Sequence, residues 1–197
     1  MREQFVKDKY LYLPNFISYN RAGLLAEELI SDANKYDWES DWDVAPNCAS
    51  QYNPIGAAEL LCEQIGKVGE LVGEPVFPTY SFGRVYRRGD TLPKHTDRAA
   101  CEISMTVHLY GDEEWYFGCY DKKFSLNPGD AILYLGTIVP HYRVGAYEGD
   151  EYAQFFLHYV RTRGCHNNCI FDSADSGLNN QQLIKELNTW HMMNDIL

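Results

Sequence analysis

The run Glu102-Ile103-Ser104-Met105-Thr106-Val107-His108-Leu109 shows the two-residue repeat that is typical of a β-strand. Its odd-numbered positions are apolar, and its even-numbered positions are polar or charged. Because successive side chains of a strand point to opposite faces, one face of this strand is expected to belong to a core. The other face either contacts water or lines a polar space inside the fold, and the residues around the run favour the second arrangement.

Further strand signals lie on both sides of this run, within residues 77–163. Aromatic and β-branched stretches predict strands at about 79–87, 102–110, 115–120, 131–135, 138–144 and 152–160. Turn sequences separate these stretches: Arg88-Gly89-Asp90, Tyr110-Gly111-Asp112, Asn127-Pro128-Gly129-Asp130 and Tyr147-Glu148-Gly149-Asp150. Short strands at this spacing predict a β-sandwich or a β-barrel.

Helical patterns occur before and after the predicted strands. Ser18 or Asn20 can cap a helix in which leucine and isoleucine recur at helical spacing. A second helix is expected at about 55–72, with Pro54 near its first turn and Gly73 at its end. A third is expected at about 179–192.

We therefore expect a single domain, residues 1–197, of the mainly β (α+β) class. Residues 1–76 would form a helical N-terminal support, residues 77–163 the β core, and residues 164–197 a C-terminal extension with a helix. The N-terminal helices would pack on the sheet.

Composition narrows the functional classes. The 197 residues include 17 Lys and Arg against 28 Asp and Glu, a net charge of −11, so a protein that binds nucleic acid over its whole surface is not expected. The chain has no apolar run of the roughly 18–20 residues that span a bilayer, and it does not begin with a secretory signal pattern. We expect a cytoplasmic protein with reduced cysteines. Cys165, His166 and Cys169 lie close together, but too few further ligands are nearby for a zinc site.

Three residues can form a metal centre. His95 and Asp97 are two positions apart, so in an extended segment both side chains point the same way, and His141 follows 44 residues after Asp97 in another predicted strand. Two imidazoles and one carboxylate are the facial triad of non-haem Fe(II) oxygenases, which leaves three metal positions for a cosubstrate and O2. Without further support, two ordinary histidines and a turn aspartate would be the preferred explanation of the pattern.

Two arginines lie in register with this centre. Arg143 shares the direction of His141 in its strand, and Arg84 lies on the same face as Tyr80, Phe82 and Tyr86. A 2-oxo acid bound to the metal needs a cation for its distal carboxylate, preferably a bidentate guanidinium. Arg143 is the first candidate and Arg84 the second, whereas an arginine that reaches the surface and pairs with an acid is the alternative for both.

Taken together, these segments resemble the 2-oxoglutarate and Fe(II)-dependent oxygenases, and among them the small prolyl-4-hydroxylase-like proteins of bacteria and phages. The segments that carry the resemblance are 78–89, Leu92-Pro93-Lys94-His95-Thr96-Asp97-Arg98, Cys101-Glu102-Ile103-Ser104, Pro128-Gly129-Asp130, Pro140-His141-Tyr142-Arg143 and 154–160.

The resemblance implies a double-stranded β-helix of the jelly-roll or cupin-like type, with Fe(II) held by His95, Asp97 and His141. It also implies that Tyr86 and His108 line the 2-oxoglutarate pocket. One departure concerns the cation that prolyl hydroxylases usually have about nine or ten residues after the distal histidine. Here that stretch reads Asp150-Glu151-Tyr152, so Arg143 or Arg84 would have to take over its part.

The implied activity is that of a dioxygenase which uses Fe(II), 2-oxoglutarate and O2 to hydroxylate a C–H bond, with release of succinate and CO2. Its substrate would be a small molecule or a peptide or protein, and the fold does not choose between them. Two alternatives are a cupin-like metalloenzyme that acts on a small molecule without 2-oxoglutarate, and a non-enzymatic β-barrel binding module. The sequence leaves the oligomeric state open.

Overall fold

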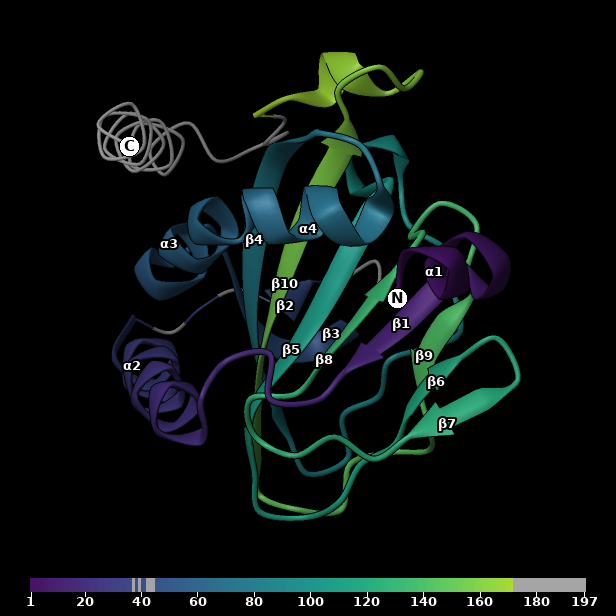
Figure 1. Ribbon diagram of the computed structural model, residues 1–197. Coiled ribbons are helices and arrows are strands. Elements are labelled where there is room, and N and C mark those ends of the chain that lie inside the picture. The colour runs from purple at the N-terminus through teal and green to yellow at the C-terminus, as the bar shows by residue number, and fades with distance from the viewer. Residues whose placement is uncertain (37, 39, 42–44, 172–197) are drawn as a thin grey trace.

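The computed structural model describes residues 1–36, 38, 40–41 and 45–171, and these residues form two antiparallel sheets with helices on one side (Figure 1). The larger sheet has the strand order β1 (Tyr10–Leu13), β8 (Ala131–Tyr134), β5 (Ile103–Gly111), β10 (Glu151–Arg161), β4 (Val76–Arg87), β3 (Ala45–Tyr52) and β2 (Ser40–Asp41). The smaller sheet has the order β7 (Lys122–Phe124), β6 (Phe117–Cys119) and β9 (His141–Arg143). This architecture agrees with the mainly β jelly-roll core expected from the sequence.

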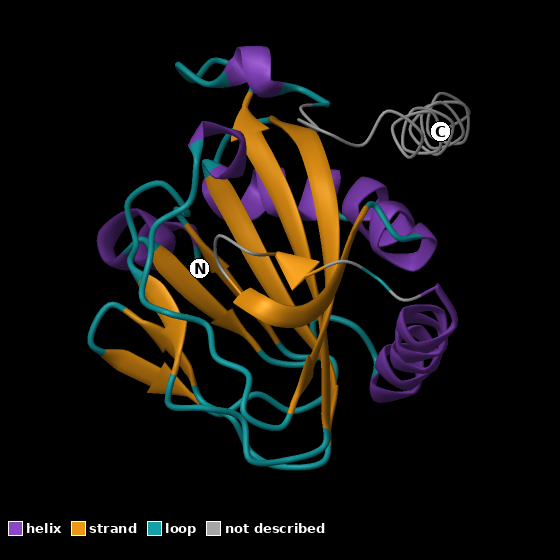
Figure 2. Cartoon of the chain, turned by 180° about the vertical axis from the view of Figure 1, so that it is seen from behind, coloured by secondary structure: helices purple, strands orange, loops and turns teal. Residues whose placement is uncertain are grey.

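The helices cover one face of the larger sheet, which lies in front of them when the molecule is seen from behind (Figure 2). They are α2 (Tyr19–Tyr36), α3 (Ile55–Glu63) and α4 (Ile65–Val72), while the short α1 (Arg2–Asp8) packs beside β1 and α4. The buried Tyr159 hydroxyl of β10 donates to the Leu61 carbonyl of α3 at 2.8 Å. None of the described helices combines the length and apolar character that crossing a bilayer requires.

The opposite face of the larger sheet is a buried polar surface. On β5 it carries Ser104, Thr106 and His108, and on the neighbouring β10 it carries Gln154 and His158. The register places Gln154 opposite His108 and His158 opposite Ser104. All five side chains are at most 5% exposed. Ser104, Thr106 and His108 of the 102–109 run therefore point into the space between the sheets, as expected, whereas Glu102 precedes β5 and pairs with Arg161.

The N-terminal part of the chain differs from the expectation of a purely helical support. The short β1 pairs with β8, and β3 pairs with β4, so this part also extends the larger sheet on both sides. The single helix expected at 55–72 is in fact two helices that meet at Gln64. The sequence pattern did not reveal this break, because apolar residues keep a helical spacing on both sides of it. Gly73 ends the second helix with a φ of 92°. The expected helix at 179–192 lies outside the described residues.

Candidate metal centre

His95, Asp97 and His141 come together where the loop after β4 meets β9. The main chains of His95 and His141 form an isolated antiparallel bridge, with N–H to carbonyl distances of 3.1 and 2.9 Å. The Asp97 N–H donates to the Gly136 carbonyl at 2.8 Å. Backbone hydrogen bonds therefore fix both segments that carry the three side chains.

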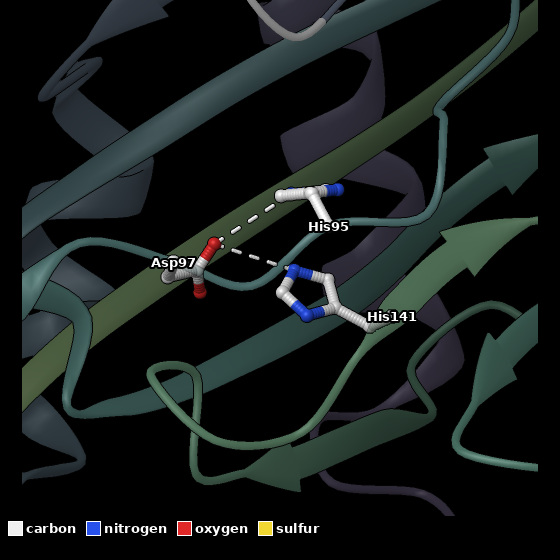
Figure 3. Close-up of side chains that lie close together, drawn as sticks. All are labelled: His95, Asp97 and His141. Carbon is white, nitrogen blue, oxygen red and sulfur yellow. Dashed lines mark ion pairs between the residues drawn. The ribbon is translucent and has the colours of Figure 1, made fainter.

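The three side chains converge on one point (Figure 3). Asp97 Oδ1 lies 3.3 Å from His141 Nε2 and 3.6 Å from His95 Nε2. One ligand atom from each residue lies within 4.8 Å of the others. His141 is buried, whereas the His95 side chain is 25% exposed and the Asp97 side chain 13% exposed, so the centre is reachable from one side. This arrangement fits two imidazoles and one carboxylate on one face of an octahedral ion.

Both histidines are set in the tautomer that a metal needs. His95 Nδ1 lies 2.7 Å from the Pro93 carbonyl, and His141 Nδ1 lies 3.0 Å from the Val139 carbonyl. Since a carbonyl oxygen only accepts, each Nδ1 carries the hydrogen and donates it. Each Nε2 then faces Asp97 and is the ring nitrogen available to a metal ion, which is the orientation that metal-binding histidines obtain from such outer hydrogen bonds.

The charges at the centre match this assignment. Burial raises the pKa of Asp97, but the hydrogen bond with His141 and the nearby imidazoles outweigh burial and lower the pKa to about 2. Burial, together with His141, lowers the pKa of His95. An ionised carboxylate beside an unprotonated imidazole is the ligand set that a divalent cation prefers.

A cavity of about 280 Å³ adjoins the three side chains. Arg84, only 4% exposed, lines it, and its Nη1 donates to the Tyr86 hydroxyl at 3.1 Å. The other lining residues are mostly aromatic or charged: Tyr52, Tyr80, Phe82, Leu92, Thr96, Arg98, Cys101, Tyr134, Phe156 and His158.

Arg143 is a buried cation deeper between the sheets, 3% exposed. Its Nη1 donates to the Trp115 carbonyl at 2.8 Å, its Nη2 donates to Gln154 Oε1, and its guanidinium lies 4.4 Å from the centre of the Tyr152 ring. Its Nε has no hydrogen-bond partner, and no carboxylate within the described part of the chain forms an ion pair with it. A buried guanidinium without a carboxylate is costly unless an anion joins it.

Three further buried polar atoms on the same inner face lack partners among the residues that the structure describes: Thr106 Oγ1, His108 Nδ1 and Gln154 Nε2. Gln154 contacts Arg143 directly, and His108 lies opposite Gln154 in the register. Burial and then the charge of Arg143 lower the pKa of His108 to about 3. Unpaired buried polar atoms are rare in folded proteins, and a group of them around a cation fits a bound polar anion.

The structure therefore brings the residues singled out in the sequence into one continuous region. Arg84 and the three candidate ligands share the cavity, and the ring of His108 stacks on Tyr152 with 4.5 Å between ring centres. Tyr86 lies near both arginines, since both Arg84 and Arg143 influence its hydroxyl. The guanidinium of Arg143 lies against Tyr152. Tyr152 belongs to the stretch 150–152, where prolyl hydroxylases usually have the cation that this chain lacks.

Four residues of this region had no role in the sequence-based hypothesis: Ser104, Thr106, Gln154 and His158. The two-residue repeat places each of them on an inner face, and this repeat was the signal that could have identified them. It does not reveal which of them lie opposite each other, because that depends on the pairing of β5 with β10.

Comparison with solved structures identifies the fold. A prolyl-4-hydroxylase from Pseudomonas putida matches with a TM-score of 0.64 at 14% identity, over 82% of this chain and 97% of that chain. The non-haem alpha-ketoglutarate-dependent epimerase SnoN from nogalamycin biosynthesis matches with a TM-score of 0.67 at 12% identity, over 82% and 81%. HygX from Streptomyces hygroscopicus, with nickel and 2-oxoglutarate bound, matches with a TM-score of 0.62 at 14% identity, over 83% and 88%.

The chain thus has the double-stranded β-helix fold of prolyl-4-hydroxylases and other 2-oxoglutarate-Fe(II) oxygenases. No protein-family model matches the sequence, and a comparison with curated proteins finds no relative.

Proposed function

We propose that the protein is an Fe(II)- and 2-oxoglutarate-dependent dioxygenase that hydroxylates a C–H bond of its substrate and releases succinate and CO2. One observation carries this proposal. His95, Asp97 and His141 present one ligand atom each, and these atoms lie within 4.8 Å of one another. Farther along the strand of His141 lies Arg143, which is buried and has no acidic partner among the described residues. This pair fits a 2-oxo diacid that chelates the metal with its 2-oxo acid end and binds the arginine with its distal carboxylate.

In this proposal His95 and His141 bind the ion through Nε2, and Asp97 binds it through Oδ1. The carboxylate supplies negative charge, and the Pro93 and Val139 carbonyls hold the rings in place. Iron bound here supplies the activation of O2 that, coupled to decarboxylation of the 2-oxo acid, makes oxidation of an unactivated C–H bond feasible. The three protein ligands leave three positions for the 2-oxo acid and O2.

The distal carboxylate of 2-oxoglutarate is assigned to Arg143. This guanidinium is buried, retains an unpaired Nε, and lies near His108 and Gln154, whose unpaired atoms supply further polar contacts. Thr106 carries another unpaired atom on the same face of the sheet. A charge-assisted contact in this buried interior is strong because burial limits competition from water for the donors. Arg84 and Tyr86 would complete the pocket from the cavity side.

The substrate is assigned to the cavity that adjoins the three ligands. Its walls at Tyr80, Phe82 and Phe156 are aromatic and buried, so they exclude water from one side of the metal and orient an apolar part of the substrate. The matched structures include prolyl hydroxylases, one of them in complex with a peptide fragment, and an epimerase and a carbocyclase from nogalamycin biosynthesis. A prolyl-4-hydroxylase-like reaction on a peptide and hydroxylation of a small molecule are both compatible with this cavity.

An anaerobic titration tests the proposal. Apo protein receives Fe(II) and then 2-oxoglutarate, and the weak visible charge-transfer band of a chelated 2-oxo acid is monitored. The band should appear for the wild-type chain and be absent in His95→Ala. If iron binds to the wild-type chain but no band forms, the 2-oxoglutarate assignment is wrong, and the cupin-like alternative gains support. If iron binding itself is unaffected in His95→Ala, the ligand assignment is wrong.

A further inference from the structure

Ser104 connects the metal-binding carboxylate with a histidine that the proposed function does not use. Its Oγ lies 2.8 Å from Asp97 Oδ2 and 3.0 Å from His158 Nδ1, and the Cys101 carbonyl is 3.2 Å away. The Ser104 and His158 side chains are both buried, at 0% and 5% exposure. These contacts lie on the side of Asp97 opposite to the one that faces His95 and His141, because those histidines contact Oδ1.

The number of hydrogens determines the direction of these hydrogen bonds. A serine hydroxyl has one hydrogen to donate, and Asp97 Oδ2 is the nearest of its acceptors and the only charged one. Ser104 Oγ then accepts the hydrogen of His158 Nδ1. The chain of donors therefore runs from His158 through Ser104 to Asp97 Oδ2.

The surrounding structure holds this chain rigidly. Ser104 and His158 lie opposite each other on β5 and β10, and the Tyr80 ring packs on His158 with 4.5 Å between ring centres. Gly136 closes the remaining side, since a Cβ atom at this position would lie 2.5 Å from both Asp97 Oδ2 and Ser104 Oγ. Oδ2 is thus enclosed by a donor and by backbone, whereas Oδ1 is free to face a cation.

We propose that Ser104 and His158 are positioning residues of the metal centre, which hold Oδ2 of Asp97 away from the ion so that the carboxylate binds through Oδ1 alone. This inference rests on the proposed function, because it assumes a metal at His95, Asp97 and His141. A carboxylate can bind a cation through one oxygen or through both. Binding through both would occupy one of the three positions that the cosubstrate and O2 require.

The number of water molecules on the bound metal tests this inference without turnover. Full-length protein is loaded with Mn(II) in the absence of 2-oxoglutarate, and the proton relaxivity of water reports the exchangeable inner-sphere waters. Three open positions are expected in the wild-type chain. Ser104→Ala frees Oδ2 to reach the metal, so its relaxivity should fall to about two thirds of the wild-type value while Mn(II) remains bound. Ser104→Thr keeps the hydroxyl and should restore the wild-type relaxivity.

A second pair of variants keeps the test decisive if Ser104→Ala fails to fold. His158→Asn retains an N–H donor near the position of Nδ1, whereas His158→Leu has a similar size and no donor. Asn should leave the relaxivity near wild type, and Leu should lower it. Wild-type relaxivity in both Ser104→Ala and His158→Leu would overturn the inference.

The failure of the proposed function gives a different result. In that case the wild-type chain would bind no Mn(II), or would bind it equally well in His95→Ala. Either result would also remove the basis of the positioning role. Binding that His95→Ala abolishes, together with unchanged relaxivity in the Ser104 and His158 variants, would refute the positioning role alone.

Discussion

Replacement of Arg143 by methionine should separate binding of the distal carboxylate from binding of the metal. Methionine retains much of the length of the side chain but removes the charge and all donors. Arg143 is 3% exposed and its guanidinium has no acidic partner within the described residues. The distal carboxylate of 2-oxoglutarate would therefore be the first carboxylate to pair with it. Its two donated hydrogen bonds go to uncharged oxygens, of Trp115 and Gln154.

The expected loss of affinity is large. Removal of one member of a buried, hydrogen-bonded charge pair costs about 2–5 kcal/mol, and each 1.4 kcal/mol corresponds to a tenfold change. The Kd of 2-oxoglutarate should therefore rise by about 30-fold to a few thousand-fold. The apo fold should persist, because the two oxygens left unpaired cost about 1–3 kcal/mol each, while removal of an uncompensated buried cation offsets a similar amount.

The assay compares two ligands by anaerobic titration of the Fe(II) protein. 2-Oxopentanoate has the same metal-chelating end as 2-oxoglutarate and carries a methyl group in place of the distal carboxylate. Arg143→Met should weaken 2-oxoglutarate strongly and leave 2-oxopentanoate almost unchanged, so that both ligands bind the variant with similar affinity. Arg84→Met serves as the matched control, because this arginine also lies beside Tyr86.

Two results would refute the reasoning. Equal weakening of both ligands would show that Arg143 acts only on the shape of the site. Unchanged 2-oxoglutarate affinity in Arg143→Met, with a selective loss in Arg84→Met, would move the carboxylate anchor to Arg84.

Three further expectations concern other parts of the molecule. Gly136→Ala should lower Mn(II) affinity as measured by titration calorimetry, because the new Cβ would lie 2.5 Å from Asp97 Oδ2, and the overpacking should also cost about 1–3 kcal/mol of stability in urea unfolding. Tyr159→Phe removes the hydroxyl that donates to the Leu61 carbonyl, so the free energy of unfolding should fall by about 1 kcal/mol, and no change would show that this bond does not hold α3 to the sheet. Below about pH 6.5 the unfolded chain protonates His108, whereas the folded chain, in which the pKa of His108 is about 3, does not. The free energy of unfolding should therefore decrease as the pH is lowered below about 6.5, by up to about 1.4 kcal/mol per pH unit. Above pH 6.5 this contribution is absent, and His108→Gln should flatten the urea-unfolding profile between pH 6.5 and 5 relative to wild type.

The sequence predicted the core of the site because strand geometry is a local property. The two-residue repeat is sufficient to put His95 beside Asp97 and Arg143 on the side of His141, and both expectations agree with the structure. The strands predicted around residues 79–87 and 152–160 correspond to β4 and β10, with small differences at their ends.

The rest depends on contacts between distant segments. Tyr10–Leu13 is a strand because it pairs with β8, more than a hundred residues later, and four residues carry little signal of their own. The link from Ser104 to His158 arises from the register of β5 with β10, which includes a shift between Ala153 and Gln154. A residue count cannot fix such a register.

The bridge between His95 and His141 has a consequence for the lifetime of the protein in the cell. The candidate ligands lie on two segments that meet only when the sheets have closed, so a bound ion would stabilise the folded state and not the unfolded one. At a free metal concentration of 100 times Kd this linkage amounts to about 2.7 kcal/mol. Under the proposed function, iron supply would then determine how often the chain opens to proteases as well as how fast it turns over substrate, and iron-starved cells would contain less of the protein itself.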